Sequence, residues 1–170
     1  VFLTPGISLQ EIAQNGKHQN LDLLLSNIQD LLAEQTVNKI AADYYHISQW
    51  LEQNASSDYE FIIIDAPAST SPISINAMLA ANLIIVPLEC EALAIKSLKR
   101  FLQAFKELQK NIEPGLRLAG ILLTMYDDEI LSHQQVCRQI YQTLGDSVFE
   151  TIIPNCPYIL EASTMGIDVI

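Results

Sequence analysis

Continuous apolar runs of strand length alternate along the chain with segments in which apolar residues recur roughly every three to four positions. The runs that predict strands are 21–25, 59–65, 83–88, 116–124 and 148–153. The segments that predict helices are 9–14, 28–51, 74–81, 92–110, 132–144 and 159–162. Apolar strands joined by helical crossovers are typical of an α/β fold, so we expect a parallel β-sheet flanked by helices on both faces.

The run from Phe61 to Ile64 is the most informative strand, because it stops abruptly at a carboxylate. Asp65 follows the run directly, and Pro67 cannot donate a hydrogen bond to a neighbouring strand. The carboxyl end of a buried parallel strand is where open α/β sheets bind ligands. Asp65 is therefore either a ligand-binding group or a polar residue that only closes the turn, and the run alone leaves both open.

Local signals predict where several helices begin and end. Ser8 with Glu11 fits a capping box at the start of the first helix. Ser132 is placed to cap a later helix, and Gly145 is placed to end it. The loops that follow the strands are then the expected location of function.

Composition limits the class of protein. The chain has 170 residues, 49% of them hydrophobic and 17% charged, which predicts one packed domain over 1–170. No apolar run approaches the ~18 residues of a membrane span. The three cysteines form neither a metal-ligand pattern nor a disulfide framework, so we expect a reducing cytoplasm. The net charge of −11 means that binding to nucleic acid would need a local basic patch.

Five blocks of sequence occur in an order and spacing that match one known family. They are 59–67, 76–81, 85–91, 120–127 and 151–154, the last followed by Glu161-Ala162. From about Leu21 onward, the chain resembles the ParA/Soj/MinD family of deviant-Walker P-loop ATPases. Blocks 86–91 and 123–127 look most like the ParA partition branch. The resemblance implies a P-loop NTPase-like three-layer sandwich.

The resemblance also implies a nucleotide site. Asp65 matches the Walker B carboxylate, which holds Mg²⁺ through water, and the loop at Pro67 lies beside the γ-phosphate in the family. The implied nucleotide-binding residues are Asp65, Pro67, Thr124, Met125, Tyr126, Pro154 and Asn155. Two features depart from the family pattern: Ala68 replaces a second Pro, and the segment 155–157 replaces a common Arg-Asn pair. These departures weaken two inferences from the family: that the loop after Asp65 is stiff, and that the segment 155–157 contacts the base.

The Walker A segment is the main element of the family pattern that the chain lacks. Six glycines occur in total, and no G-x-x-x-x-G-K-[ST] pattern is present to bring backbone N–H groups and a Lys to the phosphates. The chain is therefore either a C-terminal portion of a longer ATPase or a degenerate relative. We favour the first, because Asp65 and its loop are present. Since the Walker A Lys is absent, we expect no catalytic residue within the chain and no efficient ATP hydrolysis by it alone.

The function implied by the resemblance is a ParA-type switch in plasmid or chromosome partitioning. In such a switch ATP bridges two subunits into a homodimer, the dimer binds DNA nonspecifically, and a ParB-like partner stimulates hydrolysis. One alternative is a noncatalytic ParA-like interaction module. Another is a MinD-like cell-division regulator, which should carry an amphipathic C-terminal helix; the segment 165–170 is too short and lacks basic residues, so we expect no membrane binding.

Basic residues are concentrated in the predicted helix 92–110. Of the nine Lys and Arg in the chain, this helix contains Lys96, Lys99, Arg100, Lys106 and Lys110. Spacings of three and four place Lys96, Lys99 and Arg100 on one face. Because family members bind DNA through basic surface residues, this face is either a DNA- or partner-facing patch or a solvated helix surface. We favour the solvated surface.

Overall fold

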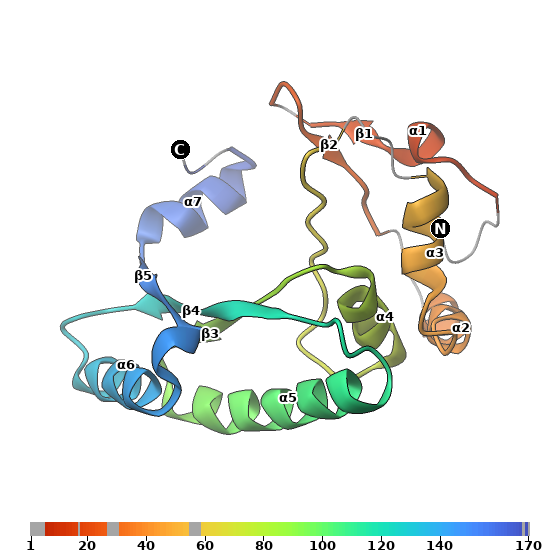
Figure 1. Cartoon of the computed structure of the whole chain (residues 1–170). Coiled ribbons are helices and arrows are strands. Elements are labelled where there is room, and N and C mark those ends of the chain that lie inside the picture. The colour runs from red at the N-terminus through yellow and green to blue at the C-terminus, as the bar shows by residue number, and fades with distance from the viewer. Residues whose placement is uncertain (1–5, 17, 27–30, 55–58, 168, 170) are drawn as a thin grey trace. The chain divides into compact units, whose positions relative to one another are not determined.

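The computed structural model describes residues 6–16, 18–26, 31–54, 59–167 and 169 (Figure 1). The chain divides into two compact units, Val1–Asn82 and Leu83–Ile170. Each unit is described by itself.

The first unit contains four helices and a small hairpin among its described residues. The elements are α1 (Leu9–Ile12), β1 (Gln14–Asn15), β2 (Asp22–Leu23), α2 (Leu31–Ile40), α3 (His46–Asn54) and α4 (Pro72–Ala80). The predicted capping box is confirmed at α1, where the Glu11 carboxylate accepts hydrogen bonds from the backbone N–H of Ser8 at 2.8 Å and from its hydroxyl at 2.7 Å.

The expected strand 21–25 is much shorter than predicted and is not parallel. Only Asp22 and Leu23 form a ladder, which is antiparallel to β1 and exposed to solvent. The intervening turn explains the pairing, because Gly16 donates its backbone N–H to Leu21 O at 2.7 Å and closes a local hairpin. A nearby antiparallel partner has therefore formed in place of the sheet that the apolar run predicts.

The predicted helix 28–51 is two helices. α2 ends at Ile40 and α3 begins at His46, and residues 28–30 lie outside the described part of the chain. Trp50 is buried on α3, and its Nε1–H donates to Ile7 O at 3.1 Å. The spacing of apolar residues correctly predicts helix on both sides of the break, because their period continues across it.

The predicted strand 59–65 is wrong. Residues 59–67 have no regular secondary structure, and Phe61 and Ile63 are 77% and 92% exposed. A strand needs a neighbour to complete its backbone hydrogen bonds, and among the described residues of this unit the β1–β2 pair is the only ladder. The polar composition of residues 54–58 predicts a loop before this segment; residues 55–58 are not described, and Asn54 is the last residue of α3.

The second unit is built around a three-stranded parallel sheet in the order β3-β4-β5 (Figure 1). Its elements are β3 (Ile84–Glu89), α5 (Ala92–Asn111), β4 (Leu118–Tyr126), α6 (Leu131–Leu144), the 3₁₀ turn η1 (Gly145–Ser147), β5 (Val148–Pro154) and α7 (Pro157–Met165). The predicted fold class, a parallel sheet flanked by helices, is confirmed here. The expected helix 159–162 is the middle of α7.

The core of the second unit lies between one face of the sheet and the helices α5 and α6. Its buried residues are Leu88, Cys90, Leu98, Ile121, Leu123, Val136, Ile140 and Val148. Leu88 pairs with Leu123, so alternate residues of neighbouring strands present one apolar face to the helices. Ile85 and Pro87 lie on the opposite face of the sheet from Leu88, and Ile85 is half exposed there.

The helix ends in the second unit are partly as predicted. α6 ends at Gly145, which has a φ of +48° and is placed where a side chain would be strained. Ser132 is not the cap, because α6 begins at Leu131 with Ile130 preceding it. In the described part of the chain, no helix is both long and apolar enough to cross a membrane.

Candidate functional site

The carboxyl ends of β4 and β5 bring together five of the nucleotide-binding residues that the resemblance implies. Tyr126 is the register partner of Pro154. The backbone N–H of Asn155 donates to Tyr126 O at 2.7 Å, which joins the two strand ends beyond the ladder. Thr124 and Met125 are the two preceding residues of β4. These five residues therefore lie at one edge of the sheet, where open α/β sheets bind ligands.

Met125 shapes this edge through its backbone. Its φ of +53° lies in the left-handed region, and the β4–β5 register shifts between Leu123 and Tyr126. A left-handed residue with a side chain costs roughly 1–2 kcal/mol, and such strain is often found at functional positions. The Met125 side chain is half exposed, so it is available to an apolar ligand surface.

Tyr126 adds a neutral hydrogen-bonding group at the same place. Burial of the phenol, together with the Cys137 thiol nearby, raises the pKa of Tyr126 above its ordinary value. The hydroxyl therefore stays protonated at neutral pH and can donate a hydrogen bond.

His133 orders the loop that follows Tyr126. The backbone N–H of Asp127 donates to His133 Nδ1 at 3.2 Å, which requires the neutral ring to carry its proton on Nε2. The His133 ring lies 6.5 Å from the Tyr126 ring between centroids. Gln134 Nε2 donates to Asp128 O at 2.7 Å. The first turn of α6 thus holds the loop 127–130. The predicted site does not include this role, and its only signal in the sequence is the group of polar residues at the start of a helix that is otherwise largely apolar on one face.

The loop after Asp65 belongs to the first unit and is held by α4. Pro67 O accepts hydrogen bonds from the backbone N–H of Ser69 at 2.7 Å and from the hydroxyl of Ser74 at 3.0 Å. The Ser74 Oγ also lies 2.9 Å from Ser69 Oγ and 3.1 Å from Ser71 Oγ. Ser74 is buried, so these hydroxyls fix the path of the loop from inside the unit.

α4 is in turn anchored by Asn76, which is fully buried. Its Oδ1 accepts the backbone N–H of Ile47 at 2.8 Å, and its Nδ2 donates to Ala41 O at 3.2 Å and Asp43 O at 2.6 Å. One amide side chain therefore satisfies three backbone groups at the break between α2 and α3. The sequence suggests this role only through an Asn in a helix whose other residues are apolar except for Ser74.

Asp65 is exposed, and no hydrogen bond to it is found in the described part of the chain. The described residues contain no group of three or more His, Cys, Asp or Glu that could hold a metal ion. These residues do not form a metal cage by themselves. A single free carboxylate does fit Mg²⁺ that keeps several waters and is shared with substrate phosphates.

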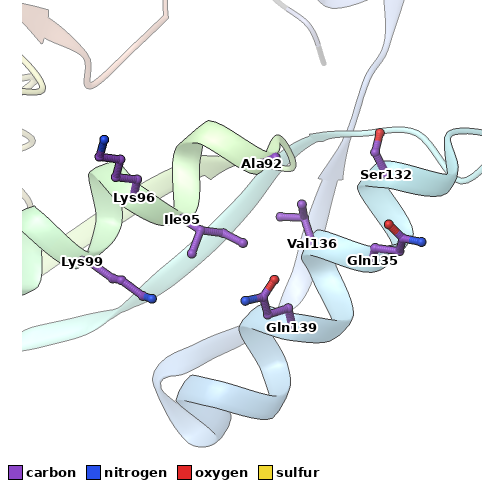
Figure 2. Close-up of a pocket in the computed structure, with 8 residues that line it drawn as sticks. All are labelled: Ala92, Ile95, Lys96, Lys99, Ser132, Gln135, Val136 and Gln139. Carbon is purple, nitrogen blue, oxygen red and sulfur yellow. The ribbon is translucent and has the colours of Figure 1, made fainter.

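The three predicted patch residues are all exposed on α5. Lys96 and Lys99 line an open groove of about 450 Å³ between α5 and α6 (Figure 2). Arg100 is not among the residues that line it. The structure thus places two of the three cations beside one concave surface.

Comparison with known proteins gives a family match and several relatives. The model of the AAA_31 family, described as an AAA domain, matches residues 2–118. The chromosome-partitioning ATPase Soj of Treponema pallidum is 38% identical over 111 residues, which cover 65% of this chain and 44% of the relative. The sporulation initiation inhibitor protein Soj of Bacillus subtilis is 30% identical over 148 residues, which cover 87% and 58%. The chain spans about half the length of the curated relatives that it matches.

Solved structures share the fold. Cobyrinic acid a,c-diamide synthase from Mycobacterium smegmatis, with bound ADP and magnesium, aligns with a TM-score of 0.76 at 25% identity, over 94% of this chain and 69% of that one. A variant of McdA from Cyanothece, in complex with ATP, aligns with a TM-score of 0.74 at 19% identity, over 95% and 63%. Both neighbours were therefore solved with a bound adenine nucleotide.

Proposed function

The chain belongs to the AAA_31 family of AAA domains and, within it, to the ParA/Soj group, and from this premise we propose that it is part of a ParA-type partition ATPase. Residues 1–170 form part of a single ATPase domain whose P-loop portion is outside this sequence. The intact protein acts as an ATP-dependent dimer switch in the segregation of a chromosome or plasmid in the cytoplasm.

The observation that carries the proposal is the joined end of β4 and β5. Tyr126 and Asn155 meet through a 2.7 Å backbone hydrogen bond at the carboxyl edge of a parallel sheet. This edge offers an exposed Met125 side chain and the Tyr126 hydroxyl, which suit the face and the polar rim of an adenine base. Thr124, Pro154 and Asn155 complete the adenine side.

As the resemblance implies, Asp65 would hold Mg²⁺ through water, and the Pro67 loop would lie beside the γ-phosphate. Mg²⁺, when bound, neutralises charge on the phosphate oxygens. Among the residues that the structure describes, none forms a hydrogen bond to the Asp65 carboxylate, and Ser74 holds the following loop through Pro67 O.

The partners follow from the same proposal. The intact protein forms an ATP-bridged homodimer that binds nonspecific DNA and is stimulated by a ParB-like protein. Lys96, Lys99 and Arg100 provide a surface for DNA or for that partner. The 170 residues alone hold no P-loop, so they bind ATP weakly and do not turn it over efficiently.

The experiment is a titration of this chain with fluorescently labelled ATP, with and without Mg²⁺, read by anisotropy and by amide NMR shifts. We expect weak binding that Mg²⁺ strengthens, with shifts at Met125, Tyr126 and Asn155. Asp65→Asn should remove the Mg²⁺-dependent part of the affinity and leave the shifts at Tyr126 in place.

Asp146→Asn is the matched control, because it removes one exposed carboxylate on η1, which precedes β5 and so lies at the opposite end of that strand from Asn155. It should behave as the wild type. The absence of shifts at Tyr126 and Asn155 at millimolar ATP, or an unchanged Mg²⁺ dependence in Asp65→Asn, would overturn the proposed nucleotide site. Fast hydrolysis by the chain itself would overturn the claim that it needs a P-loop.

A further inference from the structure

The groove between α5 and α6 has an apolar floor and a polar rim (Figure 2). Ile95 and Val136 lie between the two helices, and Ala92 lines the end near the start of α5. Lys96 and Lys99 lie on the α5 side. The α6 side is uncharged and carries Ser132, Gln135 and Gln139.

Two exposed leucines extend the apolar character at the end where both helices begin. Leu93 is 78% exposed and lies three residues before Lys96, and Leu131 is 65% exposed and lies four residues before Gln135. Residues at these spacings are neighbours on a helix surface. Neither leucine lines the groove itself, so the two add exposed apolar surface beside its Ala92 end, while Lys99 makes the other end basic.

The lysines are free to meet an external charge. In the described part of the chain, no carboxylate forms an ion pair with Lys96 or Lys99, and both side chains are exposed. The chain as a whole carries a net charge of −11, so this local basic end stands out against an acidic background. Charge complementarity thus calls for a ligand with carboxylates at one end.

We propose that this groove binds a short amphipathic segment of a partner protein, with apolar side chains over Ile95 and Val136 and carboxylates at Lys96 and Lys99. The lining of α5 from Ala92 to Lys99 is about 10 Å long at 1.5 Å per residue. That length matches about two turns of helix in the partner, a recurring mode of helix-in-groove recognition. This inference specifies the partner surface of the proposed function, but it does not depend on nucleotide binding.

DNA fits this surface less well than a polypeptide does. Binding to DNA without sequence preference rests on Lys and Arg contacts to phosphates, and here two cations flank an apolar floor. The exposed Leu93 and Leu131 gain nothing from a phosphate backbone, whereas each can be covered by an apolar side chain of a peptide.

The test is a selection from a random library of peptides about twelve residues long, displayed on phage, against the 170-residue protein. We expect the selected peptides to combine apolar residues at helical spacing with a cluster of Asp or Glu. The consensus peptide, made synthetically, should shift the amide signals of Ile95, Val136 and Gln139. Replacing its acidic residues by Lys should abolish binding.

Matched variants locate the contact. Lys96→Glu with Lys99→Glu should weaken the consensus peptide at least about tenfold, and Lys106→Glu with Lys110→Glu, exposed on the same helix outside the groove, should leave affinity within about twofold. Leu93→Gln with Leu131→Gln should also weaken it, since both leucines are exposed and their loss spares the core.

Several results would overturn the proposal. A consensus that lacks acidic residues, or no consensus at all, would remove its chemical basis. Binding of a DNA duplex that depends on Lys96 and Lys99 in the absence of peptide binding would assign the surface to nucleic acid. Self-association abolished by the same double variant in sedimentation experiments would assign it to a second copy. None of these results bears on Asp65 or Tyr126, so the nucleotide site is tested separately.

Discussion

Asn76 offers the sharpest test of how the first unit is held together. Its side chain is fully buried and makes three hydrogen bonds to backbone groups of Ala41, Asp43 and Ile47. A typical intramolecular hydrogen bond contributes about 1 kcal/mol net, and a buried group left without a partner costs about 1–3 kcal/mol. Asn76→Ala removes three such bonds and leaves three backbone groups to find other partners.

The expected loss follows from these contributions. The hydrogen bonds contribute about 3 kcal/mol, and Ala recovers up to ~0.7 kcal/mol because it is the better residue in a helix interior. We therefore expect Asn76→Ala to lower the free energy of unfolding by about 2–3 kcal/mol. Asn76→Asp should lower it at least as much, because a carboxylate of the same size would face the carbonyl oxygens of Ala41 and Asp43.

Trp50 provides the assay, because it is the one tryptophan in the chain and lies on α3. Urea unfolding followed by its fluorescence reports on the unit that contains Asn76. Asn54→Ala is the matched control: it removes a single bond, from Asn54 Nδ2 to Trp50 O at 3.0 Å, and should cost less than about 1 kcal/mol.

Two results would refute this reasoning. One is that Asn76→Ala lowers the free energy of unfolding no more than Asn54→Ala does, and the other is that Asn76→Asp keeps the wild-type midpoint of unfolding. Either result would mean that Asn76 does not anchor the break between α2 and α3. Destabilisation by Asn76→Ala would also bear on the candidate site, because α4 carries Ser74, which holds the loop after Asp65 through Pro67 O.

Three further predictions concern the second unit. Gly120→Ala should cost about 1–3 kcal/mol in a thermal melt, because a Cβ there would lie 2.9 Å from Phe149 Cε2, and a second change of Phe149 to Leu should restore part of the loss. Burial raises the pKa of the Cys90 thiol to about 11. At pH 8 this buried thiol should therefore react with a thiol reagent more slowly than Cys156. The free energy of unfolding should fall as pH rises from about 9 toward 11, because the unfolded chain loses the thiol proton before the folded chain does. Tyr141→Phe should cost about 1 kcal/mol in urea unfolding, because the phenol donates to Phe149 O at 2.7 Å; an unchanged midpoint would contradict it.

The second unit could be predicted from sequence because its strands have partners within the same stretch of chain. The runs at 83–88 and 148–153 both pair with the run at 116–124, and the helices between them cover one apolar face of the sheet. Each apolar run therefore has a strand partner nearby in the sequence, and the apolar pattern alone is enough to predict the strands. The residues proposed for the adenine side come together for the same reason, because they lie at the ends of neighbouring strands.

The first unit shows where apolar patterning is not sufficient. The run Phe61–Ile64 is as apolar as β3, yet it forms no ladder among the described residues and is largely exposed. Apolar composition predicts a preference for burial, but a strand also needs hydrogen-bonding neighbours, which no local pattern specifies. The break between α2 and α3 escapes prediction for a related reason, since it depends on Asn76, about thirty residues away along the chain.

The residues that shape the candidate site are not those that would touch a ligand. Ser74 holds the loop after Asp65, and His133 holds the loop after Tyr126, in each case by a hydrogen bond to backbone from the first turns of the following helix. Asp65 and Met125 are meanwhile left exposed. Because a ligand is bound most tightly by groups whose positions are set beforehand, substitutions at Ser74 and His133 should alter nucleotide affinity without removing any ligand contact. Family motifs predict the contacting residues, whereas only the hydrogen-bond pattern indicates which residues would position them.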